Sequence, residues 1–228
     1  MQAVHFPLGI SAIVIDLDGT MLHTAPELCE AANRMLREMD YAPVSQELLA
    51  SYIGNGISWL VKRALTGDMH ATPDAALFEH AMPIFEKHYT ALLMQSKPFD
   101  GVIEGLDAMK MSGFRLGCIT NKLTRYTDPL LKGAGLAKYF EIVLSGDTLP
   151  EKKPHPLPLL YAAKFFSVPI DKMLLIGDSL SDTVAARAAG CPVFCVPYGY
   201  NHGEPVETLE QDAVINNLPA ALPLIKRV

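Results

Sequence analysis

The sequence predicts an α/β protein with a Rossmann-like parallel sheet core and an inserted α-helical cap domain. Short apolar runs alternate with helix-spaced segments in the second half of the chain, which is typical of a parallel sheet with helices on both faces. The first two runs lie about a hundred residues apart, far more than one crossover helix needs. We expect residues 1–23 and 97–228 to form the core and residues 24–96 to form the cap.

Five apolar runs of strand length mark the expected sheet. In chain order they are Ile10–Ile15, Arg115–Ile119, Ile142–Leu144, Met173–Ile176 and Val193–Val196. Segments between the later runs, such as TRYTDPLLKGAGLAKYF and PLPLLYAAKFFSV, have apolar residues three to four positions apart, which indicates helices. In sheets of this kind ligands bind beyond the carboxyl ends of the strands.

The long insertion after the first run has an almost wholly helical pattern. Four segments carry helix-spaced apolar positions: APELCEAANRMLREMD, SQELLASYI, ISWLVKRAL and DAALFEHAMPIFEKHYTALLM. A small helical module above the edge of the sheet is the simplest interpretation. The chain shows neither an internal repeat nor a low-complexity linker.

Composition restricts the class of partner. The 228 residues carry a net charge of -6, which argues against a general affinity for nucleic-acid phosphates or anionic membranes and favours a small molecule. The four cysteines form no CxxC pair, as expected for structural cysteines in a reducing compartment. No segment reaches the roughly 18 apolar residues of a membrane span, and MQAVHFPLGI does not resemble a signal peptide. We therefore expect a cytoplasmic protein, with its oligomeric state left open.

Polar residues gather where the expected strands end. Four groups follow or separate the apolar runs: Asp16 and Asp18, Thr120 and Asn121, Lys152 and Lys153, and Asp178 and Asp182. Because the carboxyl ends of parallel strands meet at one edge of a sheet, these groups are expected to converge on one pocket.

Each of these groups also has a purely structural interpretation. The Asp-Gly pair at residues 18–19 is a common turn signal, and Thr120 and Asn121 suit the cap of a following helix. Asp182 suits the first turn of a helix, and Lys153 would usually be a solvated loop residue. All four features together at one edge are much less expected on structural grounds alone.

Transfer of a phosphoryl group is the chemistry that needs this set of residues. One carboxylate can attack phosphorus, and a second can protonate the leaving group and then activate water. Asp16 and Asp18 project from the same side of a strand, so their negative charges repel each other. A divalent cation such as Mg²⁺ beside the pair would make this arrangement tolerable. Lysine, hydroxyl and backbone N–H groups suit the remaining phosphate oxygens.

These residues resemble the signatures of the haloacid dehalogenase-like phosphohydrolases. The likeness comprises DLDGT at 16–20, the Thr-Asn pair after the second run, the lysine before proline in KKPHPLPLL, and the acids of GDSLSD. Their order and spacing match along nearly the whole chain. The resemblance implies that Asp16 is the nucleophile and that Asp18 is the general acid and then the base. Dehalogenase members lack the second acid, so its presence implies a phosphatase or phosphomutase.

The resemblance also implies a magnesium site. Its ligands would be the Asp16 carboxylate, the Asp18 backbone carbonyl and the Asp178 carboxylate, with Asp182 in a supporting position.

For the phosphate group, the resemblance implies contacts with Thr120 and Asn121. It further implies that Lys153, which directly precedes proline, pairs with the phosphate and with Asp16, rather than Lys152.

Two further segments resemble phosphoglycolate phosphatases within this family. YIGNGISWLVKRAL (52–65) is similar to their cap loop, which implies that Gly54, Asn55 and Gly56 bind substrate, and PYGYNHGEP (197–205) is similar to their C-terminal segment. The alternative for the two glycines is an ordinary turn between helices. The chain departs from the family at residues 22–24, where Leu-His-Thr replaces the common Val-Asp-Ser, so the departure concerns the hinge and the entrance.

Basic residues of the insertion and the histidines are less informative. Lys62 and Arg63 are candidates to balance a substrate carboxylate, although basic residues on a helix are usually solvated. His23 is interpreted as an entrance residue rather than a metal ligand. The other histidines show no metal-ligand spacing.

These residues and the resemblance together lead to the hypothesis of a Mg²⁺-dependent phosphatase that acts on a small phosphorylated substrate, with 2-phosphoglycolate as the leading candidate. The alternatives within the fold are a phosphatase of different specificity and a sugar phosphomutase. From other classes, a dinucleotide-binding module is disfavoured because no GxGxxG follows the first run, and a catalytically silent anion-binding protein would bind phosphate without turnover.

Overall fold

The computed structural model describes residues 5–228, and its centre is a parallel β-sheet. Within these residues six strands follow the order β6-β5-β2-β7-β8-β9. Their bounds are β2 Ala12–Ile15, β5 Arg115–Ile119, β6 Ile142–Leu144, β7 Met173–Gly177, β8 Val193–Cys195 and β9 Ala213–Val214. The central strand β2 is buried over its whole length, which explains why it is apolar on both faces.

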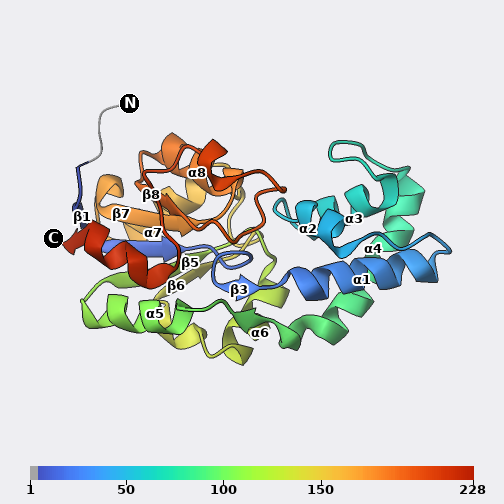
Figure 1. Cartoon of the computed structure of the whole chain (residues 1–228), viewed down its shortest axis with the longest axis horizontal. Coiled ribbons are helices and arrows are strands. Elements are labelled where there is room, and N and C mark those ends of the chain that lie inside the picture. Colours follow the sequence, from blue (N-terminus) through green and yellow to red (C-terminus); the bar gives the residue numbers. More distant parts are fainter. Residues whose placement is uncertain (1–4) are drawn as a thin grey trace.

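Side chains of β2 alternate between two hydrophobic clusters, one on each face of the sheet. Ile13 and Ile15 belong to the cluster that includes residues of α5 (Val102–Met111) and α6 (Thr124–Gly133). Ala12 and Val14 belong to the cluster that includes residues of α7 (Leu157–Phe166) and α8 (Leu180–Ala189). Figure 1 shows α5 and α6 below the sheet and α8 above it. The core is therefore an α/β sandwich of the expected class.

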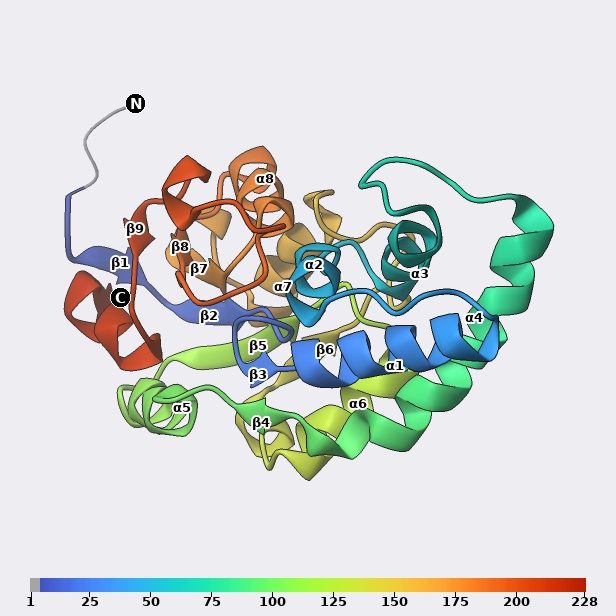
Figure 2. The same cartoon turned by 45° about the vertical axis from the view of Figure 1, so that its right-hand side comes forward.

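The inserted module leaves the core through a short hinge. Strand β3 (Leu22–His23) pairs antiparallel with β4 (Lys97–Pro98), and between them lie α1 (Ala25–Glu38), α2 (Gln46–Ser51), α3 (Ile57–Thr66) and α4 (Ala75–Leu92). These helices stand beside the carboxyl ends of the core strands in both views (Figures 1 and 2). Ser45 and Asp74 cap α2 and α4 through side-chain oxygens. The helical cap is thus present, while the division at residues 23/24 and 96/97 stays a prediction.

The first apolar run is not one strand. Its first residue, Ile10, ends β1 (Leu8–Ile10), which pairs with the C-terminal strand β10 (Ile225–Arg227), and only its last four residues form the separate strand β2. Ser11 breaks the run because its backbone N–H donates to Lys172 O and its hydroxyl donates to Val228 O. The prediction of a single strand was therefore wrong at its N-terminal end.

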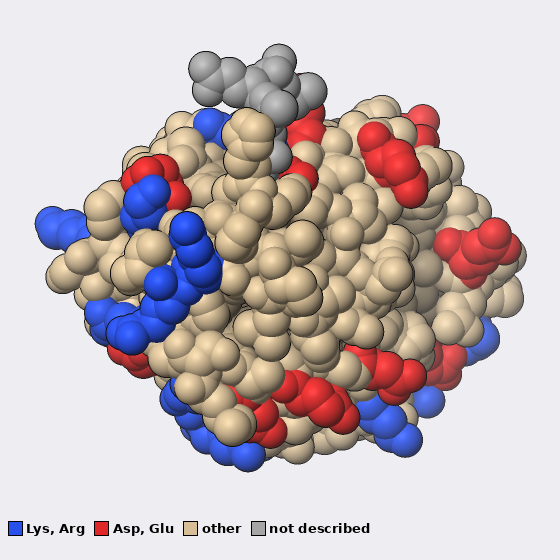
Figure 3. Space-filling model, turned by 60° about the vertical axis from the view of Figure 1, so that its left-hand side comes forward, with Lys and Arg blue, Asp and Glu red and all other residues tan. Residues whose placement is uncertain are grey.

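Figure 3 shows that uncharged side chains fill the centre of one face of the molecule, while acidic and basic side chains lie around its margin. Over residues 5–228, the helices are all too short or too polar to cross a membrane.

Candidate active site

The register of the sheet brings the acids of two strands together. Ile15 pairs with Ile176 at the ends of β2 and β7, and the next residue, Asp16, donates its backbone N–H to Ile176 O at 2.9 Å. Asp178 follows β7 directly, and Asp182 lies in the first turn of α8. Carboxylate oxygens of Asp16, Asp178 and Asp182 lie within 4.8 Å of one another, and all three residues are buried. The expected convergence of these acids is therefore present.

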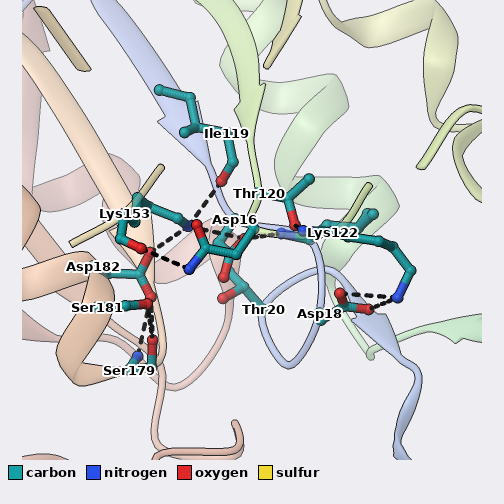
Figure 4. A network of polar contacts seen from close by, with 12 residues as sticks. Asp16, Asp18, Thr20, Ile119, Thr120, Lys122, Lys153, Ser179, Ser181 and Asp182 are labelled. Atoms are coloured by element: carbon teal, nitrogen blue, oxygen red, sulfur yellow. Dashed lines mark hydrogen bonds and ion pairs between the residues drawn. The ribbon is translucent and has the colours of Figure 1, made fainter. Parts of the chain in front are cut away.

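Lys153 lies between two of the acids, as Figure 4 shows. Its Nζ is 3.0 Å from Asp16 Oδ1 and 2.6 Å from Asp182 Oδ1, and it also donates to Ile119 O at 2.8 Å. The side chain is 1% exposed, so these contacts replace its hydration. Burial lowers the pKa of Lys153, but Asp16 and Asp182 more than offset this effect, so its pKa is raised. Lys153 is therefore a permanent cation beside Asp16.

The electrostatics of the acids favour a bound cation. Burial raises the pKa of Asp16 to about 7, although Lys153 opposes the rise. Burial, together with Asp16 and Asp182, also raises the pKa of Asp178 well above its ordinary value. When all three carboxyl groups are ionised they exceed the charge of Lys153 by two, and oxygen ligands of this kind suit a hard divalent cation such as Mg²⁺. The residues present therefore fit a divalent metal.

Asp182 supports the site rather than facing it. Its Oδ1 accepts from Lys153, while its Oδ2 accepts from Ser179 Oγ at 2.8 Å and from Ser179 N at 3.2 Å in a capping box at the start of α8. Both carboxylate oxygens are thus engaged. A Cβ at Gly177 would lie 2.4 Å from Asp182 Cγ, so only glycine fits at the end of β7.

Asp178 is held by the loop that follows Asp16 and by the segment that follows β8. Its Oδ1 accepts from Thr20 Oγ1 and its Oδ2 from Tyr200 N, both at 2.7 Å. Gly19 adopts φ +83°, and a Cβ there would lie 2.5 Å from Asp178 Oδ2. The glycine of DLDGT is therefore required both for its conformation and for the close approach of Asp178.

The sequence reasoning missed Lys122, which is the partner of Asp18. Its Nζ lies 2.8 Å and 3.0 Å from the two carboxylate oxygens of Asp18 and 5.2 Å above the ring of Tyr89 on α4. Burial lowers the pKa of Lys122, but Asp18 and Tyr89 outweigh it and the pKa is raised. Its position in the sequence, directly after Asn121 at the end of the second expected strand, could have identified Lys122 as a site residue.

Thr120 and Asn121 directly follow β5 and lie at the wall of the cavity. The Thr120 hydroxyl accepts from Lys122 N at 3.2 Å. Asn121 Nδ2 donates to Lys153 O at 2.8 Å, whereas Asn121 Oδ1 is buried without a partner in the described part of the chain. The side-chain amide of Asn121 therefore joins β5 to the loop that carries Lys153.

A cavity of about 180 Å³ lies between this cluster and the cap. The core contributes Asp16, Asp18 and Asp178 to its wall, and the cap contributes residues 53–60, which include the expected Gly54, Asn55 and Gly56. Gly54 has φ +136° and Gly56 has φ +93°, and a Cβ at Gly54 would lie 2.8 Å from the His202 ring. The predicted cap loop thus faces the acids of the core.

Lys62 and Arg63, the candidates to balance a substrate carboxylate, contact other groups of the cap. Arg63 is buried and donates to Tyr52 O at 2.7 Å and to Asn55 Oδ1 at 2.8 Å, so it shapes the cap loop. Lys62 Nζ lies 4.9 Å above the ring of Trp59.

The hinge contains His23. Its ring lies 5.2 Å from the ring of Phe99, within an aromatic cluster at the hinge.

Comparison with known proteins agrees with this geometry. The family model described as haloacid dehalogenase-like hydrolase matches residues 13–196. The chain belongs to this family. A Thiobacillus denitrificans protein named phosphoglycolate phosphatase is 57% identical, over 97% of this chain and 98% of its own length. A Nitrosospira multiformis protein of the same name is 52% identical, over 98% and 99% of the two chains.

Solved structures share the fold. A crystal structure from Haemophilus somnus, described as a predicted phosphoglycolate phosphatase, has a TM-score of 0.86 and 31% identity and covers 93% of this chain and 96% of its own. The resemblance stated from the sequence motifs is therefore confirmed.

We expect Gly19→Ala to weaken cation binding beyond its effect on stability. Gly19 and Gly190 have φ of +83° and +78°, so alanine imposes similar strain at both, roughly 1–2 kcal/mol. Nothing lies within 4 Å of a Cβ at Gly190, whereas at Gly19 the methyl group presses on Asp178. Gly19→Ala should lower Mg²⁺ affinity by about tenfold or more, and Gly190→Ala should leave it unchanged. Calorimetric titration measures this difference, and equal affinities would contradict the role of Gly19.

We expect Mg²⁺ to raise Tm more at about pH 8 than at about pH 5. The pKa of Asp16 is raised from 3.8 to about 7, so without cation the folded state binds more protons than the unfolded chain between these values. The free energy of unfolding then falls as pH rises through this range, and above it a cation relieves the repulsion. Thermal unfolding with Mg²⁺ and with a chelator tests this, and an equal rise in Tm at both pH values would argue against a cation at these acids.

Proposed function

We propose that the protein is a Mg²⁺-dependent phosphomonoester hydrolase that converts 2-phosphoglycolate to glycolate and phosphate. The observation that carries the proposal is one cavity in which Asp16, Asp18 and Asp178 of the core face the loop of residues 53–56 of the cap. The names of relatives at 57% and 52% identity over almost their full length support this substrate.

In the first step Asp16 acts as nucleophile. Lys153 and the backbone N–H of Leu17 both contact Asp16 Oδ1, at 3.0 Å and 2.7 Å, which leaves Oδ2 for attack on phosphorus. A new bond forms between Oδ2 and phosphorus as the bond from phosphorus to the ester oxygen breaks. Asp18 donates a proton to that oxygen, and glycolate leaves.

In the second step Asp18 acts as base. It takes a proton from water, the water oxygen attacks phosphorus, and the bond to Asp16 breaks to release phosphate. Lys122 holds both oxygens of Asp18 at 2.8 Å and 3.0 Å, so it orients this carboxyl group between the steps.

The cation site of the proposal consists of oxygen ligands only. The Asp16 and Asp178 carboxylates and the Asp18 backbone carbonyl would hold Mg²⁺, while Asp182 keeps Lys153 in place. When bound, Mg²⁺ neutralises the acids and the negative charge of the phosphate. Thr120 and Asn121 contact the phosphate oxygens at the end of β5.

The remaining parts of the proposal concern the cap and the compartment. Residues 54–56 of the cap loop bind the organic part of the substrate, and closure of the cap excludes water from the reactive acyl phosphate. We place the protein in the cytoplasm, which its four free, buried cysteines support.

We expect Asp16→Asn to lower phosphate release from 2-phosphoglycolate by at least about a thousandfold, because an amide is a poor nucleophile. The matched control is Asp171→Asn, since Asp171 is 62% exposed and paired with Lys172, outside the cavity. Initial rates with Mg²⁺ should be unchanged in the control. A panel of sugar phosphates, nucleotides and p-nitrophenyl phosphate tests the substrate: preference for another phosphate would overturn phosphoglycolate, and undiminished turnover by Asp16→Asn would overturn the mechanism.

A further inference from the structure

Two neighbouring lysines point to different parts of the site. Lys153 is buried against Asp16 and Asp182, whereas Lys152 is exposed and lines the cavity. Lys152 Nζ lies 3.4 Å from Asn55 O and 3.5 Å from the position of a Cβ on Gly56. The core therefore places one ammonium group at the nucleophile and the next at the cap loop.

Lys152 is the cavity cation that has no acidic partner among residues 5–228. The lysines that line the cavity are Lys122 and Lys152. Lys122 contacts both oxygens of Asp18, so its charge is compensated. Lys152 has no carboxylate within 4.0 Å in this part of the chain, and its contact with Asn55 O is long for a hydrogen bond. Its charge is thus free to meet an anionic group of a ligand.

The position of Lys152 suits a second anionic group close to the phosphate. The bare face of Gly56 lies 3.5 Å from Lys152 Nζ and 3.9 Å from Asn121 O, measured from the position of a Cβ. Lys152 therefore lies where the end of β5 meets the cap loop. In 2-phosphoglycolate a single methylene group separates the carboxylate from the ester oxygen, so the two anionic groups must be bound near each other.

Among residues 5–228, the wall of the cavity holds no other cation that lacks an acidic partner. Leu28, Ile53, Trp59 and Leu60 are apolar parts of the wall. Arg63 donates to Tyr52 O and Asn55 Oδ1 and does not line the cavity.

We propose that Lys152 binds the carboxylate of the substrate and thereby selects small phosphate esters that carry a second negative charge. This inference rests on the proposed function, whose phosphoryl-transfer residues do not include Lys152. A charge-assisted hydrogen bond to a carboxylate contributes to binding whether or not phosphorus is being attacked, so its loss should appear mainly in KM.

The kinetic test compares 2-phosphoglycolate with 2-hydroxyethyl phosphate, in which a hydroxymethyl group replaces the carboxylate. Lys152→Gln should raise KM for 2-phosphoglycolate by about tenfold or more, with little change in kcat. The same substitution should leave KM for 2-hydroxyethyl phosphate unchanged. Lys152→Arg, which keeps the positive charge, should retain most of the lower KM for 2-phosphoglycolate. Lys172→Gln is the matched control, because it removes one positive charge from an exposed lysine paired with Asp171.

A binding test uses the single tryptophan of the chain, Trp59, which lines the cavity. In the Asp16→Asn background, titration with 2-phosphoglycolate should change its fluorescence, and adding Lys152→Gln should weaken Kd by a similar factor. This readout requires no turnover.

The outcomes separate the two proposals. Equal loss for both substrates in Lys152→Gln, or unchanged KM for 2-phosphoglycolate, would overturn the role of Lys152 and leave the proposed function standing. If the wild type hydrolyses 2-hydroxyethyl phosphate and 2-phosphoglycolate with equal kcat/KM, the proposed substrate is overturned. Selection by Lys152 is then overturned with it.

Discussion

The arrangement of the site depends on keeping Asp16, Asp178 and Asp182 together around one lysine inside the protein. Removing each charge from water costs several kcal/mol, and Lys153 compensates only one of the three carboxylates. The fold meets this constraint with close packing, since a Cβ at Gly177 or Gly199 would lie under 3 Å from atoms of Asp182 or Asp178. The remaining charge imbalance equals that of one divalent cation. Gly177, Gly199, Lys153 and the register of the sheet therefore all help to hold the three acids close together.

The second constraint is that the site is shared between core and cap. Lys122 of the core contacts Asp18 and lies over the ring of Tyr89 on α4. The hydroxyl oxygen of Tyr200 of the core accepts a hydrogen bond from Ala25 N at the start of α1. The hinge strands β3 and β4 join these parts a few residues from Asp18. A movement of the cap would consequently change the surroundings of Asp18, which in the proposed mechanism couples closure to proton transfer.

Much of the fold could be predicted because its elements have clear periods. Strands β2 and β7 are wholly apolar or glycine and buried over their whole length, as central parallel strands are, and the acids that follow them, Asp16 and Asp178, identify the site. The break at Ser11 could not be predicted, because it depends on hydrogen bonds to Lys172 and Val228, which are remote in sequence. Strand β9 has only two residues and β10 has the sequence Ile-Lys-Arg, so neither forms an apolar run that the sequence could reveal. Lys122 was missed because a lysine in a loop is usually solvated, and only the folded chain shows Asp18 beside it.

The division of labour within the KK pair at 152–153 follows from burial. A buried lysine between two carboxylates has a fixed position and a fixed charge, so Lys153 suits the step common to phosphoryl transfer. Lys152 is exposed at the cap loop, so its charge can bind an anionic group in the organic part of a ligand. In the proposed function, core geometry therefore determines the reaction, and the contact between Lys152 and the cap loop determines which phosphate ester is bound. A shared fold therefore does not by itself imply a shared substrate.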